Sequence, residues 1–390
     1  MRSFNLICII VILLASVQAV AAAETYVYST QWGKVGGGAG AGIGEFNQPA
    51  RIAFDATGNV FVDDMNNNRI QKFDPAGTFL TTWGSEGVAD PPSAAGTFLF
   101  PMGVAVDSMN YLYVADRMIH RVQVMDPDQL WAIFGPNGPT ELLQPSDVAV
   151  DSNDNLYVVD WGHDRIRVFD LYGSPIGEWG TTGSGNGNLI GPRGIAIDAA
   201  DNVYVADTGN NRIEKFTLDG TYVAQWGTAG TGDTQFNGPW GVGTDTAGNV
   251  YVADTGNNRV QKFDANGAYL ATIGGPGTGN GQFAEPYDVS VNSTGTVFVA
   301  DTGNNRVQLF DQQAGPVVLA VPPEVNLPTD TNADGLYDDV NGNGRKDFAD
   351  VVLYFNQLTW IAANEPLVPF DYNANGRIDF GDVVQLFNTI

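Results

Sequence analysis

A ten-residue phrase recurs along the chain. Residues 203–212 and 250–259 both read V-Y-V-A-D-T-G-N-N-R, and residues 297–306 read V-F-V-A-D-T-G-N-N-R. Looser copies extend the series toward the N-terminus, and the aligned aspartates of six units lie 44 to 52 residues apart. Repetition at this period is typical of folds in which each unit packs mainly against its neighbours. An arginine follows each aspartate by five residues, and the pairs are Asp64 and Arg69, Asp116 and Arg121, Asp160 and Arg165, Asp207 and Arg212, Asp254 and Arg259, and Asp301 and Arg306.

Each unit contains four short β-strand signals. In residues 239–274 these are G-V-G-T-D, V-Y-V-A-D, V-Q-K-F-D and A-Y-L-A-T-I. Branched and aromatic residues favour strands, and the Asn, Gly and Asp clusters between them favour tight turns. Four strands in roughly 45 residues indicate a β-propeller blade. A solenoid is the weaker alternative, because the coils of a parallel β-helix are shorter.

The two ends of the repeat region complement each other. The sixth unit stops at Phe310 and Asp311 without the Trp-Gly that ends other units. Residues 26–33, Y-V-Y-S-T-Q-W-G, resemble the fourth-strand segment F-L-T-T-W-G at residues 79–84. We therefore expect residues 25–32 to form the outer strand of the last blade, which closes the ring and leaves no long unpaired edge.

The repeated D-T-G-N-N-R phrase resembles the NHL repeat family of six-bladed propellers, over residues 25–315. The resemblance implies an all-β, six-bladed β-propeller at residues 24–314. The first three units depart from the phrase, with D-M-N-N-N-R, D-R-M-I-H-R and D-W-G-H-D-R. Six equivalent Asp and Arg pairs indicate a structural role, because both side chains can make charge-assisted hydrogen bonds around the turn and a catalytic site needs asymmetry.

Ligand recognition is expected where the blades differ, near the mouth of the central channel. A proline precedes each unit, and the two residues after it lead into the innermost strand. Glycine is the usual second residue, so charged residues there are departures. Aromatic and charged residues at these positions would suit a peptide or a sugar, while ordinary solvated rim residues are the alternative. The candidate ligand-binding residues are Arg51, Asp147, Arg193, Trp240, Tyr287 and Asp288.

Evidence for catalysis is weak. The two histidines, His120 and His163, fall in equivalent turns of adjacent units and read as polar turn residues. A metal site that combines them with Asp164 is conceivable, but two histidines cannot make a three-histidine zinc site. The sequence contains no G-x-S-x-G, no H-E-x-x-H and no phosphate-binding loop. We therefore leave enzymatic activity open and favour a binding role.

The N-terminus has the layout of a secretory signal peptide. Arg2 precedes an apolar run at residues 6–14, and Ala21 to Ala23 provide small residues for cleavage. Residues 1–23 are therefore predicted to be removed, with an uncleaved anchor as the alternative. The rest of the sequence has no segment apolar enough to span a bilayer. Cys8, the only cysteine, lies in this segment, so the mature chain is predicted to lack disulfides.

The charge balance bears on the partners. Asp and Glu outnumber Lys and Arg by 44 to 18, which gives a net charge of −26. Nucleic-acid binding depends on neutralising phosphates with basic groups, so we expect no nucleic acid as a partner. An acidic surface favours solubility and is compatible with calcium.

The composition changes after residue 314. Residues 315–329 are predicted to be a proline-rich linker. Residues 339–350 read D-V-N-G-N-G-R-K-D-F-A-D and residues 371–382 read D-Y-N-A-N-G-R-I-D-F-G-D, each followed by an apolar helical pattern. Oxygen-bearing side chains at positions 1, 3, 5, 9 and 12, with glycine at 6 and a backbone carbonyl at 7, match calcium loops. The predicted ligands are Asp339, Asn341, Asn343, Arg345 (carbonyl), Asp347 and Asp350, and Asp371, Asn373, Asn375, Arg377 (carbonyl), Asp379 and Asp382.

A third calcium site is left open. Residues 330–336, D-T-N-A-D-G-L, begin like another loop but overlap the next one. Its ligands would be Asp330, Asn332, Asp334 and the Leu336 carbonyl. Metal-free turns rich in Asp and Asn are the alternative for all of these loops.

The duplicated loops, each followed by a helical pattern, resemble dockerin modules over residues 329–390. The resemblance implies a small α-helical, calcium-binding domain at residues 330–390 that docks onto a cohesin-like protein. A cell-envelope component is the other partner considered.

Together these features predict a secreted or cell-surface binding protein. Its propeller would recognise an extracellular protein, peptide or glycan, and its calcium-dependent tail would attach it to a partner. An anchored extracellular enzyme, a lyase or a hydrolase acting on peptide or carbohydrate, is the main alternative. A structural spacer in a cell envelope is a third. Asn292 begins a glycosylation sequon, and its use is left open.

Overall fold

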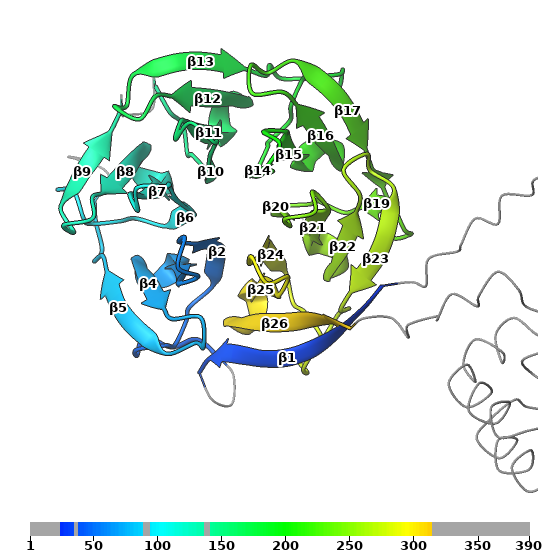
Figure 1. The fold of residues 1–390 in the computed structure, drawn as a ribbon, viewed down its shortest axis with the longest axis horizontal. Helices are drawn as coiled ribbons and strands as arrows, with labels where there is room; N and C mark the ends of the chain where they lie inside the picture. The colour runs from blue at the N-terminus through cyan, green and yellow to red at the C-terminus, as the bar shows by residue number, and fades with distance from the viewer. Residues whose placement is uncertain (1–23, 35–37, 89–93, 136–140, 314–390) are drawn as a thin grey trace, which may run out of the picture. The chain divides into compact units, whose positions relative to one another are not determined.

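The described part of the chain forms a six-bladed β-propeller. The computed structural model describes residues 24–34, 38–88, 94–135 and 141–313. Within these ranges the chain forms six four-stranded antiparallel sheets arranged around a central axis (Figure 1). The predicted all-β propeller is therefore confirmed. Within the same ranges, no helix is long and apolar enough to cross a bilayer. The predicted signal peptide, linker and dockerin-like domain lie outside the described residues.

Each blade runs from an innermost strand at the channel to an outermost strand at the perimeter. Blades 1 and 2 contain β2 (Pro49–Phe54), β3 (Val60–Asp64), β4 (Arg69–Phe73) and β5 (Phe79–Trp83), and β6 (Pro101–Val106), β7 (Leu112–Asp116), β8 (Arg121–Met125) and β9 (Trp131–Phe134). Blades 3 and 4 contain β10 (Asp147–Val150), β11 (Leu156–Asp160), β12 (Arg165–Phe169) and β13 (Pro175–Trp179), and β14 (Gly194–Ile197), β15 (Val203–Asp207), β16 (Arg212–Phe216) and β17 (Tyr222–Trp226). Blade 5 contains β20 (Val242–Thr244), β21 (Val250–Asp254), β22 (Arg259–Phe263) and β23 (Tyr269–Ile273), and it is preceded by the short parallel pair β18 (Thr228–Ala229) and β19 (Gln235–Phe236). Blade 6 contains β24 (Pro286–Val291), β25 (Val297–Asp301), β26 (Arg306–Gln313) and β1 (Thr25–Gly33).

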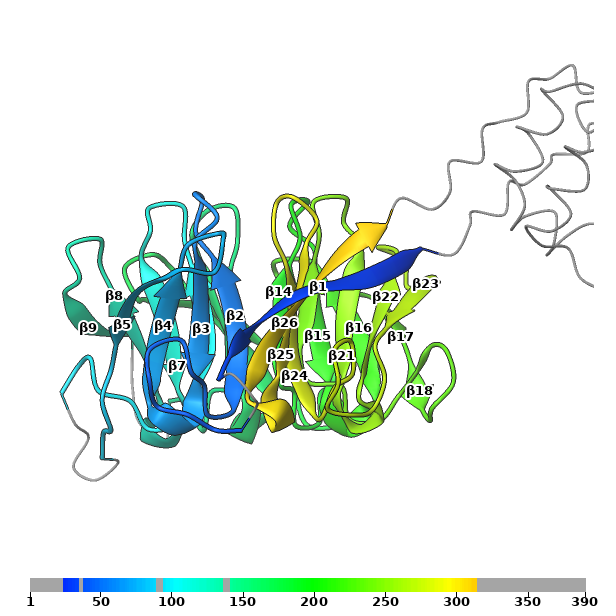
Figure 2. The same ribbon diagram turned by 90° about the horizontal axis from the view of Figure 1, so that it is seen from below.

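The ring closes through the first strand of the chain. β1 pairs antiparallel with β26, from Thr25 opposite Gln313 to Gly33 opposite Arg306, and Figure 2 shows the two strands side by side. The predicted closure by residues 25–32 is therefore confirmed. A Glu24–Lys262 ion pair also ties the start of this strand to blade 5.

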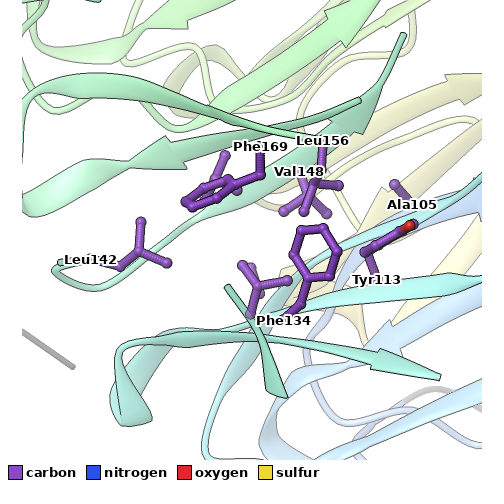
Figure 3. Close-up of a cluster of buried hydrophobic side chains, with 10 residues drawn as sticks. Ala105, Tyr113, Phe134, Leu142, Val148, Leu156 and Phe169 are labelled. Atoms are coloured by element: carbon purple, nitrogen blue, oxygen red, sulfur yellow. The ribbon is translucent and has the colours of Figure 1, made fainter. Parts of the chain in front are cut away.

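Apolar side chains fill the spaces between adjacent blades. Figure 3 shows the cluster between blades 2 and 3, where Tyr113 and Phe134 meet Val148, Leu156 and Phe169. The rings of Tyr113 and Phe134 lie edge to face, with centroids 5.1 Å apart, an arrangement that aromatic pairs favour. Each blade thus buries both of its faces against its neighbours.

The predicted tight turn between the second and third strands contains a single turn of 3-10 helix in every blade. The residue after each helix has left-handed backbone geometry, with φ between 53° and 57°, which Asn and Asp tolerate better than most residues. The helices are η1 (Met65–Asn67), η2 (Arg117–Ile119), η3 (Trp161–His163), η4 (Thr208–Asn210), η5 (Thr255–Asn257) and η6 (Thr302–Asn304).

The repeated Asp and Arg organise the loop that enters each blade. In blade 5, Arg259 Nε donates to Asp254 Oδ2 at 2.8 Å, and Asp254 Oδ1 accepts the backbone N–H of Asn237 at 2.8 Å. Arg259 Nη2 also donates to the carbonyls of Gly232 and Gln235. The aspartate and the arginine thereby hold the entering loop against the 3-10 turn. The equivalent ion pair is present in all six blades, at 2.6 to 3.1 Å.

The left-handed residue after each 3-10 helix connects its blade to the next. Its side chain accepts the backbone N–H of the residue that precedes the proline of the following blade. All six hydrogen bonds are present, at 2.6 to 2.9 Å, so they form a closed ring. The acceptors are Asn68, His120, Asp164, Asn211, Asn258 and Asn305.

Blade 4 departs from this network at one buried position. In four blades a glutamine amide donates to the repeat aspartate and to a loop carbonyl, as Gln261 does to Asp254 and Gln235. Blade 4 has Glu214 there, whose Oε2 is buried and has no hydrogen-bond partner, although its Oε1 lies 3.1 Å from Arg212 Nη2. Burial raises the pKa of Glu214 to about 7, and the charge of Arg212 only partly offsets this effect.

We predict that Glu214→Gln stabilises the propeller selectively at alkaline pH. The raised pKa means that the folded state holds a proton that the unfolded state releases above its lower pKa, so stability falls as pH rises toward about 7. At pH 8 the variant should gain about 1 to 3 kcal/mol, the usual cost of a buried unsatisfied group, and near pH 4 the gain should vanish. Urea unfolding of both proteins at the two pH values measures this. An equal effect at both pH values would contradict the assignment.

Candidate functional site

The six inner-strand prolines and the six 3-10 helices lie on one face of the ring. In blade 1, for example, Pro49 pairs with Asp64, the residue just before η1. Blades 2 and 6 have the same pairing. We call this side the proline face. It contains the departures from the repeat that the sequence places after each proline, so the candidate site is described from this end.

Arg51 spans the channel below the proline face. Its side chain is only 2% exposed, and its Nε lies 3.1 Å from Asp147 Oδ2 of blade 3. The two groups form an ion pair, but the angle at Arg51 Nε does not allow a hydrogen bond. Nη1 donates to the carbonyl of Tyr287 at 2.8 Å, and Nη2 donates to the carbonyl of Arg193 at 2.7 Å. One guanidinium thus links blade 1 to blades 3, 4 and 6.

The two aspartates among the candidates also connect blades. Asp147 Oδ2 accepts the N–H of Ile195 at 3.1 Å, and Asp288 Oδ2 accepts the N–H of Ile52 at 3.0 Å. Burial raises the pKa of Asp147 to about 7 and also raises that of Asp288, while Arg51 opposes both shifts. The structure therefore places Arg51, Asp147 and Asp288 inside the channel, held by neighbouring blades, whereas the sequence suggested positions on its rim.

Below Arg51 the channel contains a cavity of about 230 Å³. Its walls come from the six inner strands, which Figure 1 shows around the centre of the ring. Apart from Arg51 and the two aspartates, the lining is mainly aliphatic, as at Val148 and Ile195. The polar groups at one end of the cavity are therefore already engaged in hydrogen bonds within the protein.

Asp63 is a buried carboxyl group that the sequence reading missed. It is fully buried, and neither of its oxygens has a hydrogen-bond partner. Burial, reinforced by the adjacent charge of Asp64, raises its pKa well above the usual range. The other blades have Ala or Val at this position, so the doubled Asp at residues 63 and 64 was the available signal. Burial without a hydrogen-bond partner thus favours the protonated, uncharged form of this side chain.

The other three candidates lie together on the rim with two residues that were not predicted. The rings of Trp240 and Tyr287 are stacked at a tilt, with centroids 3.8 Å apart. The Arg193 guanidinium lies 4.0 Å from the Trp240 ring and 5.1 Å from the Trp161 ring. Arg117 lies 5.1 Å from Trp161. These five residues form a continuous row, here called the arginine–aromatic arc.

Both arginines of the arc lack an acidic partner. Ten arginines fall in the described residues, and the other eight each form an ion pair with Asp or Glu. Arg193 Nη1 and Arg117 Nε are buried without a hydrogen-bond partner. Burial lowers the pKa of both, that of Arg193 to about 10 with help from the charges of Arg117 and Arg51. The arc is thus a site of unneutralised positive charge.

Part of the arc comes from departures from the repeat at the first residue of the 3-10 helix. In blades 4 to 6 the first residue of the 3-10 helix is threonine, and its Oγ1 donates to the proline carbonyl of the next blade at 2.7 Å. In blades 1 to 3 this position holds Met65, Arg117 and Trp161. Two of the five arc residues therefore come from altered copies of D-T-G-N-N-R, a signal that was present in the sequence.

The histidines have structural partners. His120 Nδ1 accepts the N–H of Gln144 at 2.9 Å, in the place that Asn takes in four other blades. His163 Nδ1 lies 2.8 Å from Asp160 Oδ2. Across the described ranges, no three His, Cys, Asp or Glu side chains come together in a metal-binding arrangement.

Comparison with known families identifies the repeat. The NHL repeat model matches residues 142–169, 189–216, 236–263 and 283–310. These segments cover the first three strands of blades 3 to 6. The chain therefore contains NHL repeats within a six-bladed propeller.

Curated relatives share a short segment of the chain. Peptidyl-glycine alpha-amidating monooxygenase of Mus musculus is 42% identical over 86 residues, which is 21% of this chain and 9% of that protein. The Rattus norvegicus counterpart is 41% identical over the same length. The match thus spans less than a tenth of these relatives.

Two solved structures have the same fold. They are auxiliary nutrient binding proteins of Bacteroides thetaiotaomicron and Bacteroides ovatus, each with a TM-score of 0.56. Their sequences are 10% and 15% identical, and each alignment covers 74% of this chain and 77% of the other. At this identity the likeness concerns the fold alone.

We predict that Arg51→Gln destabilises the propeller by about 3 kcal/mol or more, because removing one partner leaves Asp147 buried without its counter-charge. Adding Asp147→Asn should recover part of the loss, since the two residues are coupled. Urea unfolding of the single and double variants measures both effects. A single variant as stable as the unmodified protein would show that the ion pair does not hold the blades.

Proposed function

We propose that this chain is an exported binding protein. Its propeller would recognise an extracellular ligand at the proline face, and its tail would attach it, in a calcium-dependent manner, to a partner protein or to the cell surface. The arginine–aromatic arc is the observation that carries the propeller part of this proposal. The presence of NHL repeats in a six-bladed propeller also supports a binding or interaction role.

The arc is difficult to explain as scaffold. Two of its five residues, Arg117 and Trp161, replace threonines that make an interblade hydrogen bond in the other half of the ring. They also leave two partly buried guanidiniums without counter-charges. Departures from local rules that bring no structural gain are expected at functional sites. A ligand that covers the arc would supply the missing interactions.

An extracellular enzyme is the second candidate. The observation in its favour is the pair of perturbed carboxyl groups, Asp63 and Asp147, near Arg51. Raised pKa values are common among catalytic acids. However, both groups are fully buried, and Asp147 is already held by Arg51 and Ile195. Binding at the partly buried arc on the rim is therefore the better supported function.

Export and attachment rest on the sequence. Residues 1–23 carry the signal-peptide pattern, and residues 339–350 and 371–382 carry the two calcium loops. All of these lie outside the described residues. The dockerin-like pattern supports a cohesin-like or cell-envelope partner, and Ca²⁺ is the proposed ion.

Substitutions in the arc test the binding part of the proposal. We expect the double substitution Arg117→Thr and Trp161→Thr to abolish ligand binding while changing the free energy of unfolding by no more than about 1 kcal/mol. The introduced threonines can donate to the carbonyls of Pro145 and Pro192, as in blades 4 to 6, and one such bond contributes about that amount. A random displayed-peptide library and an oligosaccharide array, applied to both proteins, measure the binding.

Leu80→Thr on the outer strand β5, where Leu80 is 48% exposed, is the matched control and should leave binding intact. If every ligand found with the unmodified protein also binds the double variant, the arc is not the recognition surface.

Calcium titration tests the attachment part of the proposal. We expect the full chain to bind about two calcium ions, and Asp339→Ala or Asp371→Ala to remove one each, because position 1 supplies a direct ligand. Calorimetric titration measures the stoichiometry, and a third ion would implicate the loop at Asp330. Asp74→Ala in a propeller turn is the control and should change nothing. An absence of binding at millimolar calcium would refute the proposed module.

A further inference from the structure

We propose that the arginine–aromatic arc binds an acidic peptide segment of a partner protein, and that a side-chain carboxylate of this segment neutralises Arg193 and Arg117. This inference rests on the proposed function and names its ligand class. The distribution of charge supports it. The chain has a net charge of −26, yet the two described arginines without an acidic partner lie in one row on one face.

The two guanidiniums are available for hydrogen bonding. The Arg193 side chain donates no hydrogen bond to any described residue, and its guanidinium lies over the rings of Trp161 and Trp240. Arg117 Nη1 donates to Met102 Sδ at 3.1 Å and Nη2 donates to Gln144 Oε1 at 3.3 Å, while its Nε stays unpartnered; neither acceptor carries a charge. Both guanidiniums lie against Trp161. Planar guanidiniums of this kind suit bidentate binding of a carboxylate.

The partly buried setting strengthens such an interaction. Arg193 sits among aromatic rings and near the charges of Arg117 and Arg51, which oppose its ionisation. A carboxylate placed there relieves this repulsion, and its attraction is larger than at an exposed surface because the local dielectric is lower. Such a ligand also satisfies donors that are otherwise left without partners.

The rim beside Arg117 is apolar. Met118 is 37% exposed and Phe100 is 42% exposed. The backbone N–H of Met118 donates to the carbonyl of Leu99, so the two exposed side chains belong to adjoining turns. In blades 3 to 6 the position of Met118 is glycine. An apolar side chain next to the carboxylate of a peptide would fit this surface.

The aromatic rings favour a peptide over an acidic glycan. Sugars bind by stacking on an aromatic face, which requires a free face. Here Trp240 contacts both Tyr287, at 3.8 Å, and Arg193, at 4.0 Å. The Arg117 and Arg193 guanidiniums each lie 5.1 Å from the Trp161 ring. The rings thus hold the arginines in place and are not open platforms.

The test uses the random displayed-peptide library with the full chain, counter-selected with the Arg117→Thr and Trp161→Thr protein. We expect the selected peptides to be enriched in Asp or Glu next to an apolar residue. A synthetic selected peptide should bind about tenfold or more tightly than its Asn or Gln analogue. Arg193→Gln should remove this difference. Lys34→Gln removes the same charge from an exposed lysine outside the arc and should preserve it.

The outcomes separate this inference from the proposed function. Peptides that need the arc but show no acidic enrichment would overturn the inference and leave the binding role standing. Binding of an oligo-uronate to the arc more tightly than any selected peptide would also overturn it. If no peptide or oligosaccharide depends on the arc, the proposed function itself fails.

Discussion

The ring of hydrogen bonds between blades is the constraint on which the rest of the structure depends. In each blade the aspartate and arginine fix the entering loop, and the left-handed residue then accepts an N–H from the next blade. Adjacent blades are joined covalently only by the loop that leads from one to the next. The interblade hydrogen bonds and the apolar clusters therefore determine how the blades are placed around the ring. They also fix where each inner strand begins, and therefore which side chains reach the channel and which reach the rim.

The same six-fold rule makes the departures informative. His120 and Asp164 replace Asn but still accept the interblade N–H, so they preserve the scaffold. Arg117 and Trp161 replace threonine and give up a hydrogen bond that the other half of the ring retains. Arg51 lies between these extremes: it breaks the glycine pattern yet links four blades. Only substitutions like Arg117 and Trp161, which lose an interblade hydrogen bond, indicate a ligand.

The repeat predicted the fold well because its signal is copied six times. The Asp and Arg pairs, the four strands per blade and the closure by residues 25–32 all follow from local patterns that each unit repeats. The site was predicted only in part. Arg193, Trp240 and Tyr287 do lie at the rim, but Arg51, Asp147 and Asp288 turn inward, since contacts across the ring decide this direction. Arg117 and Trp161 were visible as altered motif letters, and their position opposite Arg193 depends on the ring geometry.

The most direct test of the account is amide hydrogen exchange of the full chain with and without a peptide selected on the unmodified protein. We expect added protection in η2, η3 and the starts of β14, β20 and β24, the elements that carry or adjoin the arc. The turns on the opposite face of the ring should be unaffected. Protection confined to that opposite face, or spread equally over all six 3-10 helices, would contradict the claim that recognition resides where the blades depart from the repeat.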